Sequence, residues 1–528
     1  MTSPVGTVTS ESRTRRLGID FMTMTGGFVV RAALSMLISV LTARYLRPDA
    51  MGRYAFLVWL AGLLAVVLSL GLPTTLIRYV AEALGAGRPA TAGALLRLVV
   101  RWQLVLVVAA ITVIAIATGL LPGDWRLPLL LTTLSVPSLV LNGSVGGFLS
   151  GLQVFGWQAL LSVAMLGLLA GLFVLVAALD GGLSGLMLAH ALANAAGLLV
   201  LVWLARREGR RRGALPGTGS LATETRTDVV RYARSASVLV VLDAVVWQRT
   251  EVALLQALAP AAQIAFYALA FGIASQAGRI PAQASTLLFP SFPELVGAGR
   301  AAELAGLHAT AMRYLVLLGA PLSIGLAVTA PAIIRVLYGP AYDEAAPVLA
   351  ALALGSLVAF ASGASPAVLH ATKRQQWLVR QGVLAAVVDL LLALLLIPLA
   401  GALGAALASL GAQAVGSVLA IRAAVRIAGA GVPLGALVRI TAAALAMGAV
   451  AAVPVWTLGA APGLVAAVLL GAATYPLALR VVRALSVEDL ERARVLVERL
   501  PARVRTGGLA VAGYLCRGPV PEPWSPSR

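Results

Sequence analysis

The sequence is poor in the residues that form covalent cross-links, metal sites and charged surfaces. Of its 528 residues, 12% are charged, 3 are histidines and 1, Cys516, is a cysteine. A single cysteine excludes an internal disulfide. No histidine cluster has zinc-ligand spacing, and neither a Ser-His-Asp arrangement nor a Gly-Lys-Ser/Thr nucleotide motif can be found. The sequence therefore predicts no metal, no cofactor and no ATP-driven pump, and we do not expect an enzyme.

Apolar residues dominate the chain instead. They make up 60% of it, and the mean hydropathy is +0.94. A soluble fold could not bury so much apolar surface, so the composition indicates a polytopic membrane protein. The net charge of +19 comes from arginines gathered between the apolar segments, and Lys373 is the only lysine. Anionic lipid head groups are the expected partners of these arginines, and no nucleic acid is expected.

Fourteen apolar segments are long enough to cross a bilayer as helices. They predict an all-α integral membrane protein with about 14 transmembrane helices. A short polar hinge at 42–56 links the first two segments, and the chain then repeats this arrangement. In chain order the helices are expected at 22–41, 54–72, 98–121, 127–151, 158–179, 183–204, 235–257, 264–289, 314–336, 345–370, 378–399, 402–421, 437–458 and 463–485.

The second half of the chain repeats the first. Leu46, Pro48, Tyr54 and Ala55 return as Leu258, Pro260, Tyr267 and Ala268. Gly182, Gly185, Leu188, Ala189 and Gly197 return 219 residues later as Gly401, Gly404, Leu407, Ala408 and Gly416, with Asn194 opposite Gln413. We therefore expect two pseudo-symmetric six-helix lobes around a central cavity, followed by a C-terminal helix pair. Because six is even, both lobes have the same orientation and can rock by alternating access.

This organisation predicts six regions along the chain. They are a cytoplasmic tail at 1–21, an N-lobe at 22–204, a basic cytoplasmic linker at 205–234, a C-lobe at 235–427, two further helices at 428–485 and a cytoplasmic tail at 486–528. The last tail has helical spacing over 490–500, typical of a membrane-surface helix, and then a proline-rich tip.

The distribution of arginine predicts that both termini lie on the cytoplasmic side of a bacterial inner membrane. The even-numbered connections hold most of the basic residues, including the cluster between Arg206 and Arg212, and cytoplasmic loops are enriched in such residues. The first odd-numbered connection breaks this pattern with Arg44, Arg47 and Arg53. We expect these three arginines to have a separate role.

Six of the charged side chains inside predicted membrane helices stand out, because a charge there is costly unless it faces a cavity or a partner. They are Arg31, Asp243, Arg249, Glu251, Arg279 and Asp389. The three guanidinium groups are candidate ligands for a pyrophosphate, because guanidinium makes bidentate hydrogen bonds to phosphate. The three acidic residues are candidate gate or ion-coupling groups. Structural pairing between helices is the alternative role for all six, and it is favoured for Asp389.

Smaller features concern how the helices pack. Gly143, Gly147 and Gly151 recur every four residues, a spacing that lets another helix approach closely. His190 lies one turn from Asn194 and predicts either a proton relay or, preferably, a hydrogen bond between helices. The other two histidines, His308 and His370, are expected at the membrane interface.

Several motifs occur in a characteristic order. The first half contains Leu41-Thr-Ala-Arg-Tyr-Leu-Arg-Pro-Asp-Ala-Met-Gly-Arg-Tyr54 and Gly71-Leu-Pro-Thr-Thr-Leu-Ile-Arg-Tyr-Val-Ala-Glu82. The second half contains Ile264-Ala-Phe-Tyr-Ala-Leu-Ala270, Leu337-Tyr-Gly-Pro-Ala-Tyr342 and Ile397-Pro-Leu-Ala-Gly-Ala-Leu-Gly-Ala405. Together, over about residues 20–425, they resemble the bacterial oligosaccharide flippases of the polysaccharide-transporter family.

The resemblance implies a member of the multidrug/oligosaccharidyl-lipid/polysaccharide exporter superfamily. Such proteins move an undecaprenyl-pyrophosphate-linked glycan from the cytoplasmic to the outer leaflet by alternating access. Members often carry an aspartate just before the arginine position of the seventh helix. This chain has Val246-Trp-Gln-Arg249 there, with Asp243 one turn earlier. An ion-coupling role for that acidic position therefore does not carry over directly.

Three other functions remain open at this stage. Lipid II flippases also have fourteen helices, and Arg31, Arg53 and Arg279 could serve as their basic cavity residues, although their arginine-rich first helix is missing here. Cation-coupled multidrug exporters usually need an acidic residue in the membrane core of the first lobe, and none can be placed. A non-transporting scaffold could use the basic linker to dock a polysaccharide polymerase or glycosyltransferases.

Overall fold

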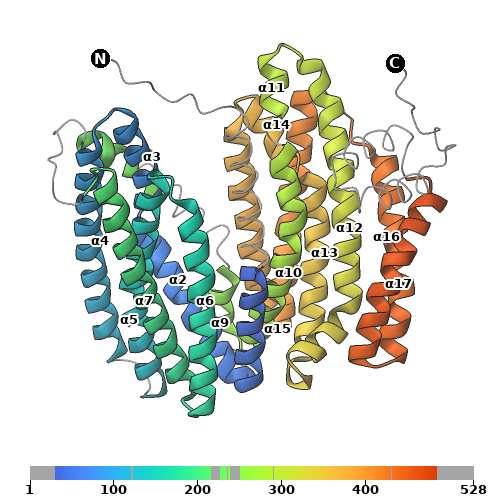
Figure 1. Ribbon diagram of the computed structural model, residues 1–528. Helices are drawn as coiled ribbons and strands as arrows, with labels where there is room; N and C mark the ends of the chain where they lie inside the picture. Colours follow the sequence, from blue (N-terminus) through green and yellow to red (C-terminus); the bar gives the residue numbers. More distant parts are fainter. Residues whose placement is uncertain are drawn as a thin grey trace, which may run out of the picture. The chain divides into compact units, whose positions relative to one another are not determined.

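The computed structural model describes residues 30–119, 123–215, 226–234, 236–237, 250–288, 291–429 and 431–484. Within these ranges the secondary structure is helical and contains no strand. The chain divides into two compact units, Met1–Ala265 (unit 1) and Phe266–Arg528 (unit 2) (Figure 1). The all-α prediction is confirmed.

Unit 1 begins its described part with a helix over 30–45, which ends at the predicted polar hinge. The next helix starts at Pro48, where the missing proline N–H needs no helical partner. The helices that follow are α2 (Pro48–Ser69), α3 (Leu72–Gly85), α4 (Pro89–Thr118), α5 (Gly123–Gly151), α6 (Phe155–Ala178), α7 (Gly182–Arg211) and α9 (Thr250–Leu258). Residues 226–234 are also helical.

Helix α10 (Ala261–Leu288) begins just before unit 2, and the remaining helices lie within unit 2. They are α11 (Ser291–Gly297), α12 (Leu304–Leu337), α13 (Ala345–Ser362), α14 (Ser365–Ala371), α15 (Gln375–Ala428), α16 (Leu434–Thr457) and α17 (Ala460–Val481), with short 3-10 turns at Ala301–Glu303 and Pro340–Tyr342.

Ten of the described helices are long and apolar enough to cross a membrane. One of them, α15, contains a break at Gly401 (φ 53°, ψ −127°), so it comprises the two spans expected at 378–399 and 402–421. Helix α10 corresponds to the eighth expected span, and the helices over 30–45 and Thr250–Leu258 are the described parts of the first and seventh. The predicted order of membrane helices is therefore confirmed.

The bounds differ from the prediction where a helix continues beyond the apolar run. Helix α3 was not predicted, although its buried Leu72, Leu76, Val80 and Ala83 recur at helical spacing. Helix α7 continues to Arg211, so the start of the predicted linker is helical. Basic side chains at the end of a membrane helix can place their charged groups in water, so a helix can continue past its apolar run. The predicted surface helix at 490–500 and the N-terminal tail lie outside the described residues.

The internal repeat is visible in the backbone. Gly182 (φ 57°) and Gly401 (φ 53°) hold left-handed conformations at the turn before corresponding helices, a conformation that glycine adopts readily. Three residues on, a Cβ on Gly185 would lie 2.8 Å from Val176 Cγ1, and one on Gly404 would lie 2.1 Å from the Leu396 carbonyl oxygen. Both glycines thus allow a helix to pack closely on the one before it, which confirms the repeat.

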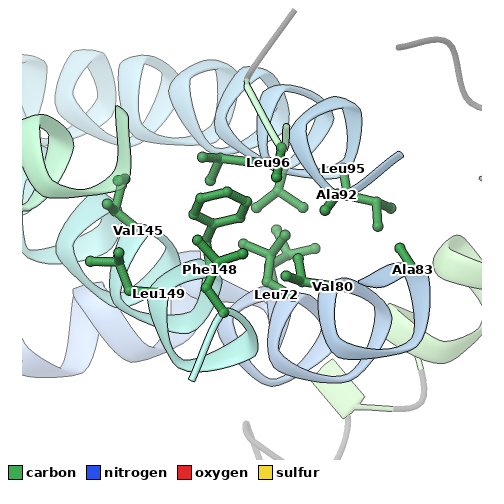
Figure 2. Packing of buried hydrophobic residues seen from close by; sticks show 14 of the residues in the cluster. Leu72, Val80, Ala83, Ala92, Leu95, Leu96, Val145, Phe148 and Leu149 are labelled. Carbon is green, nitrogen blue, oxygen red and sulfur yellow. The ribbon is translucent and has the colours of Figure 1, made fainter. Parts of the chain in front are cut away.

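Gly143, Gly147 and Gly151 of α5, which we call the glycine stripe, pack against α3. Their four-residue spacing predicted the close approach of another helix, although not which one. A Cβ on Gly147 would lie 2.6 Å from the Pro73 carbonyl oxygen, and one on Gly151 would lie 2.7 Å from Val80 Cβ. A hydrophobic core surrounds this contact and joins α3, α4, α5 and α7. Figure 2 shows the Phe148 ring among the leucines and valines of α3 and α4. Val229 and Ala233 complete this core, so residues 226–234 belong to unit 1.

The last two helices pack on α12. Gly448 of α16 faces Ile324, whose Cγ2 would be 2.6 Å from an added Cβ. Tyr475 of α17 donates a hydrogen bond to the Leu317 carbonyl at 2.8 Å. His308, also on α12, is buried within unit 2, which the sequence did not indicate, while its expected position at the membrane interface stays a prediction. The residue is 0% exposed and lies 3.1 Å from Ser365 Oγ, because α14 packs over it.

Candidate functional site

A cavity of about 290 Å³ lies inside unit 1, between α5, α6 and α7. Its polar lining consists of Asn142 on α5, Gln158 and Ser162 on α6, and His190 and Asn194 on α7. Leucines and Met165 of α6 form an apolar wall. None of its lining residues among those described is charged. We call this space the polar cavity.

Small residues on α7 keep the polar cavity open. Gly197 lines it, and a Cβ there would lie 3.4 Å from Met165 Sδ. Ala193, one turn earlier, also lines it. Larger side chains at these positions would fill the space between α6 and α7, since protein interiors pack to high density.

His190 is held at the edge of the polar cavity by α2 and α6. Its Nε2 atom and the Tyr54 hydroxyl are 2.9 Å apart. The Phe173 ring packs edge-on against both rings, with centroid distances of 5.3 Å to His190 and 6.1 Å to Tyr54. The preferred prediction for His190, a hydrogen bond between helices, is confirmed. The prediction missed its partner Tyr54, which had been noted only as a member of the internal repeat and of the first motif.

The amides of the polar cavity are only partly satisfied. Asn142 donates from Nδ2 to the Asn194 carbonyl at 3.3 Å, while its buried Oδ1 has no hydrogen-bond partner in the part of the chain that the structure describes. Gln158 donates from Nε2 to Ser150 Oγ at 3.3 Å. Buried polar groups normally have partners, so Asn142 Oδ1 is an acceptor open to a bound donor.

The charged residues singled out from the sequence lie elsewhere. Arg31 and Arg279 have exposed side chains, Glu251 is buried with 6% exposure, and Asp389 is half-buried on α15. None of these four lines the polar cavity. Asp243 and Arg249 lie outside the described residues, so their placement stays a prediction. Within the described residues, no group of three or more His, Cys, Asp or Glu side chains could hold a metal ion.

The hinge after the first helix makes specific contacts with the rest of unit 1. Tyr45 donates from its hydroxyl to Asp180 Oδ1 at 3.2 Å and accepts from the Gly182 amide at 2.9 Å. The Arg53 guanidinium lies 5.5 Å from the Trp125 ring centroid, a cation–π geometry. One of the three hinge arginines therefore stacks on α5, and the separate role expected for the three stays a prediction.

The opposite end of unit 1 contains a break between α2 and α3. Leu70 (φ 46°) and Gly71 (φ 63°) are left-handed there. Ser237 donates from its hydroxyl to the freed Leu70 carbonyl at 2.7 Å. A Cβ on Gly71 would lie 2.9 Å from Ala236. Residues 236–237, which precede the seventh span, thus pack against the break between α2 and α3. Hydropathy alone does not reveal this contact.

The family of the chain follows from its first half. A family model described as polysaccharide biosynthesis protein matches residues 20–296, more than half of the sequence. The chain belongs to the polysaccharide biosynthesis protein family. This confirms the resemblance drawn from the hinge and helix motifs. A second model, lipid II flippase MurJ, matches residues 278–470, so the two matches overlap over 278–296. No sequence among the curated proteins matches this family member.

Solved structures show the same fold. The lipid II flippase MurJ in an inward closed conformation is similar over 87% of this chain and 98% of its own, with a TM-score of 0.72 and 14% identity. An inward-facing multidrug resistance MATE family transporter of the MOP superfamily is similar over 76% and 95%, with a TM-score of 0.64 and 13% identity. Its outward-facing counterpart has a TM-score of 0.54 over 78% and 95%, with 15% identity. At these identities the likeness shows the fold of the polysaccharide biosynthesis protein and no more.

Proposed function

We propose that this polysaccharide biosynthesis protein is a flippase. Its cargo is an undecaprenyl-pyrophosphate-linked oligosaccharide, which it carries across the cytoplasmic membrane for cell-surface polysaccharide synthesis. The match of the polysaccharide biosynthesis model to residues 20–296 carries this proposal. The MurJ model over residues 278–470 supports it, because that relative is named as a flippase.

Alternating access is the mechanism that we propose. Transporters of the same fold occur in inward-facing and outward-facing conformations. The two conformations must differ in their affinity for the cargo or for a coupling ion, because a ligand shifts an equilibrium only by its differential affinity. The bound pyrophosphate is the most costly part of the cargo to bring across a bilayer, since buried charge requires compensation.

Arg31, Arg249 and Arg279 are the proposed pyrophosphate ligands. The exposure of the Arg31 and Arg279 side chains is consistent with this role, because a charged ligand must reach them. Arginine suits the task because its planar fork binds two phosphate oxygens at once.

Asp243, Glu251 and Asp389 are the proposed gate or ion-coupling groups. Glu251 is buried near the start of α9, and a buried carboxylate is sensitive to protonation and to the charges around it. An acidic group of this kind can favour one conformation over the other.

A lipid II flippase is the second candidate. The MurJ model matches the second half of the chain, and the MurJ structure has a TM-score of 0.72. Both candidates carry a polyprenyl pyrophosphate, so they differ in the attached glycan. The identity of the glycan that accumulates without the protein distinguishes them.

We place the protein in the bacterial inner membrane with both termini in the cytoplasm. The basic cluster at the end of α7, which includes Arg206, Arg207 and Arg210, would then face the anionic cytoplasmic leaflet. The Arg207 guanidinium lies 5.4 Å from the Trp203 ring centroid, and tryptophans are enriched at membrane interfaces. A polysaccharide polymerase and glycosyltransferases are the proposed protein partners.

The test is mass spectrometry of undecaprenyl-linked glycans in cells depleted of the protein. We expect one intermediate to accumulate, to stay inaccessible from outside, and to clear when the wild type is restored. The double variant Arg249→Ala, Arg279→Ala should not clear it. The matched control, Arg422→Ala with Arg426→Ala, removes two exposed arginines at the end of α15 and should clear it.

Three results would contradict this proposal. Absence of any accumulating intermediate favours drug export or a scaffold. An intermediate that is already accessible from outside argues against flipping. Clearance by the Arg249→Ala, Arg279→Ala variant at the wild-type rate argues against the pyrophosphate ligands.

A further inference from the structure

We infer that the polar cavity of unit 1 binds one uncharged sugar ring of the lipid-linked cargo. The inference rests on the proposed flippase function and adds a glycan subsite to it. The subsite is separate from the arginines proposed for the pyrophosphate, because none of the described ones lines the cavity.

The size of the cavity limits its occupant. Its volume of about 290 Å³ is close to the smallest volumes of small-molecule pockets, about 300 Å³. A single ring with its substituents fits this space, and a whole oligosaccharide does not.

The charge of the lining excludes several other ligands. The described lining has no carboxylate and no guanidinium or ammonium group. A phosphate or a metal cation taken from water into this site would lack the compensating charge that buried ions require. Neutral hydrogen-bonding groups do not have that requirement.

The polar wall offers donors and acceptors from three helices. Asn142 supplies an open acceptor at its buried Oδ1. His190 uses Nε2 toward Tyr54, which leaves Nδ1 as its second hydrogen-bonding atom. Gln158 and Ser162 add an amide and a hydroxyl from α6. The Gln158 amide bonds to Ser150, and the Ser162 hydroxyl donates to the Ala159 carbonyl at 2.7 Å, so Ser162 offers its oxygen as an acceptor. Hydroxyl groups of a sugar can both donate and accept, so they match such a mixed set.

The remaining lining from α6 is apolar and suits the face of a sugar ring. It consists of Leu161, Met165, Leu166 and Leu169. A pyranose ring has hydroxyls around its edge and C–H groups on its faces, so one cavity with both kinds of wall accommodates it. An acyl chain would leave the polar wall without partners, which is unfavourable.

The corresponding place in unit 2 is built differently. By the repeat, Asn194 corresponds to Gln413 and His190 to Ser409. The Gln413 side chain reaches toward α13, where its Oε1 would be 3.5 Å from a Cβ on Gly355. The longer amide therefore occupies space beside α13, and the histidine is replaced by a small residue. The combination of Asn142, His190 and Asn194 belongs to unit 1.

The test compares two synthetic ligands on the full-length protein in lipid nanodiscs. One is a short-chain polyprenyl pyrophosphate without sugar, and the other carries a single N-acetylhexosamine. Native mass spectrometry gives the affinity of each. We expect the wild type to bind the sugar-bearing compound about tenfold more tightly, the gain that a few hydrogen bonds supply.

The decisive variant is Ser162→Leu, which places a larger apolar side chain in the polar wall. This variant should bind the two compounds with about equal affinity, because the sugar no longer fits. The affinity of the variant for the sugar-free compound should stay at the wild-type value. Ala164→Leu is the matched control, because Ala164 lies on the same helix but is exposed and does not line the cavity. It should keep the tenfold preference.

The outcomes separate the subsite from the flippase function. If Ser162→Leu keeps the preference, or the wild type shows none, the glycan subsite is overturned while binding of the sugar-free compound still supports the flippase. If the wild type binds neither compound, the flippase proposal itself is overturned. Unchanged affinity of Ser162→Leu for the sugar-free compound also verifies that this variant is folded.

Discussion

The Tyr475 hydroxyl of α17 donates a 2.8 Å hydrogen bond to the Leu317 carbonyl of α12. That carbonyl lacks its usual helical partner, because the residue four positions later is Pro321, which has no N–H. A side chain of the last helix thus satisfies a backbone group that proline leaves open in the second lobe. This contact fastens the C-terminal helix pair to α12.

Tyr475→Phe should therefore lower stability. Removing the hydroxyl leaves the Leu317 carbonyl unsatisfied, at a cost of about 1–3 kcal/mol. Thermal unfolding in nanodiscs measures the change. Tyr79→Phe is the control, because the Tyr79 contacts that the structure defines are made by its ring, with Tyr232 and Arg78. Equal unfolding temperatures for the two variants would contradict the role given to Tyr475.

Gly147→Ala should separate α3 from α5. Its Cβ would lie 2.6 Å from the Pro73 carbonyl oxygen, so the backbone of α3 must shift. Overpacking of this kind costs about 1–3 kcal/mol. Gly146→Ala is the neighbouring control, since nothing lies within 4 Å of its added Cβ. We expect a lower unfolding temperature for the first variant only, and a wild-type value for Gly147→Ala would argue against close packing at the stripe.

Gly401→Ala should disturb the turn between the two halves of α15. The φ of 53° with ψ of −127° is unfavourable for a residue with a side chain, and strain of this kind costs about 1–3 kcal/mol. Gly382→Ala on the same helix has open space around its Cβ and normal helical geometry. The yield of folded protein and its unfolding temperature should fall for Gly401→Ala and stay level or rise for Gly382→Ala. The opposite order would contradict this account of the turn.

The contact between Tyr54 and His190 should show energetic coupling. Tyr54→Phe, His190→Phe and the double variant form a cycle, and the 2.9 Å hydrogen bond predicts a coupling energy of about 1 kcal/mol. Chemical denaturation of each variant gives the four free energies. Strict additivity would mean that the bond contributes nothing to the stability of unit 1.

Arg279 should need its guanidinium and not only its charge, if it binds pyrophosphate as proposed. Arg279→Lys keeps the positive charge but loses the bidentate fork. We expect Arg279→Ala to slow clearance of the accumulated lipid-linked intermediate about tenfold or more, and Arg279→Lys to lie between Ala and wild type. Wild-type clearance by Arg279→Ala would remove this residue from the proposed ligands.

Much of the helix order was predictable because membrane helices depend on local sequence. A run of apolar residues must satisfy its own backbone hydrogen bonds in lipid, and a helix does so within the segment. The correspondence of Gly182 with Gly401 was found from the repeat in the sequence. Helix α3 was missed because its apolar residues lie on one face of the helix and do not form a continuous apolar segment. The hydropathy pattern therefore indicated a loop.

The candidate site was only partly predictable. His190 attracted attention as a polar residue inside a helix, but Tyr54 lies 136 positions away in the chain, and no local pattern joins the two. The burial of His308 was missed for the same reason, since Ser365 is 57 positions distant. Contacts of this range depend on how helices pack.

The sequence by itself determined the membrane environment, the order of the spans, the internal repeat and the glycine stripe, because each depends on the spacing of residues along one segment. Tertiary structure alone decided which polar side chains meet. The polar cavity exists because α5, α6 and α7 bring Asn142, Ser162 and His190 to one place. The Leu317 carbonyl has a hydrogen-bond donor because α17 packs on α12. These contacts between side chains of different helices depend on how the helices pack, which the spacing of residues along one segment does not specify.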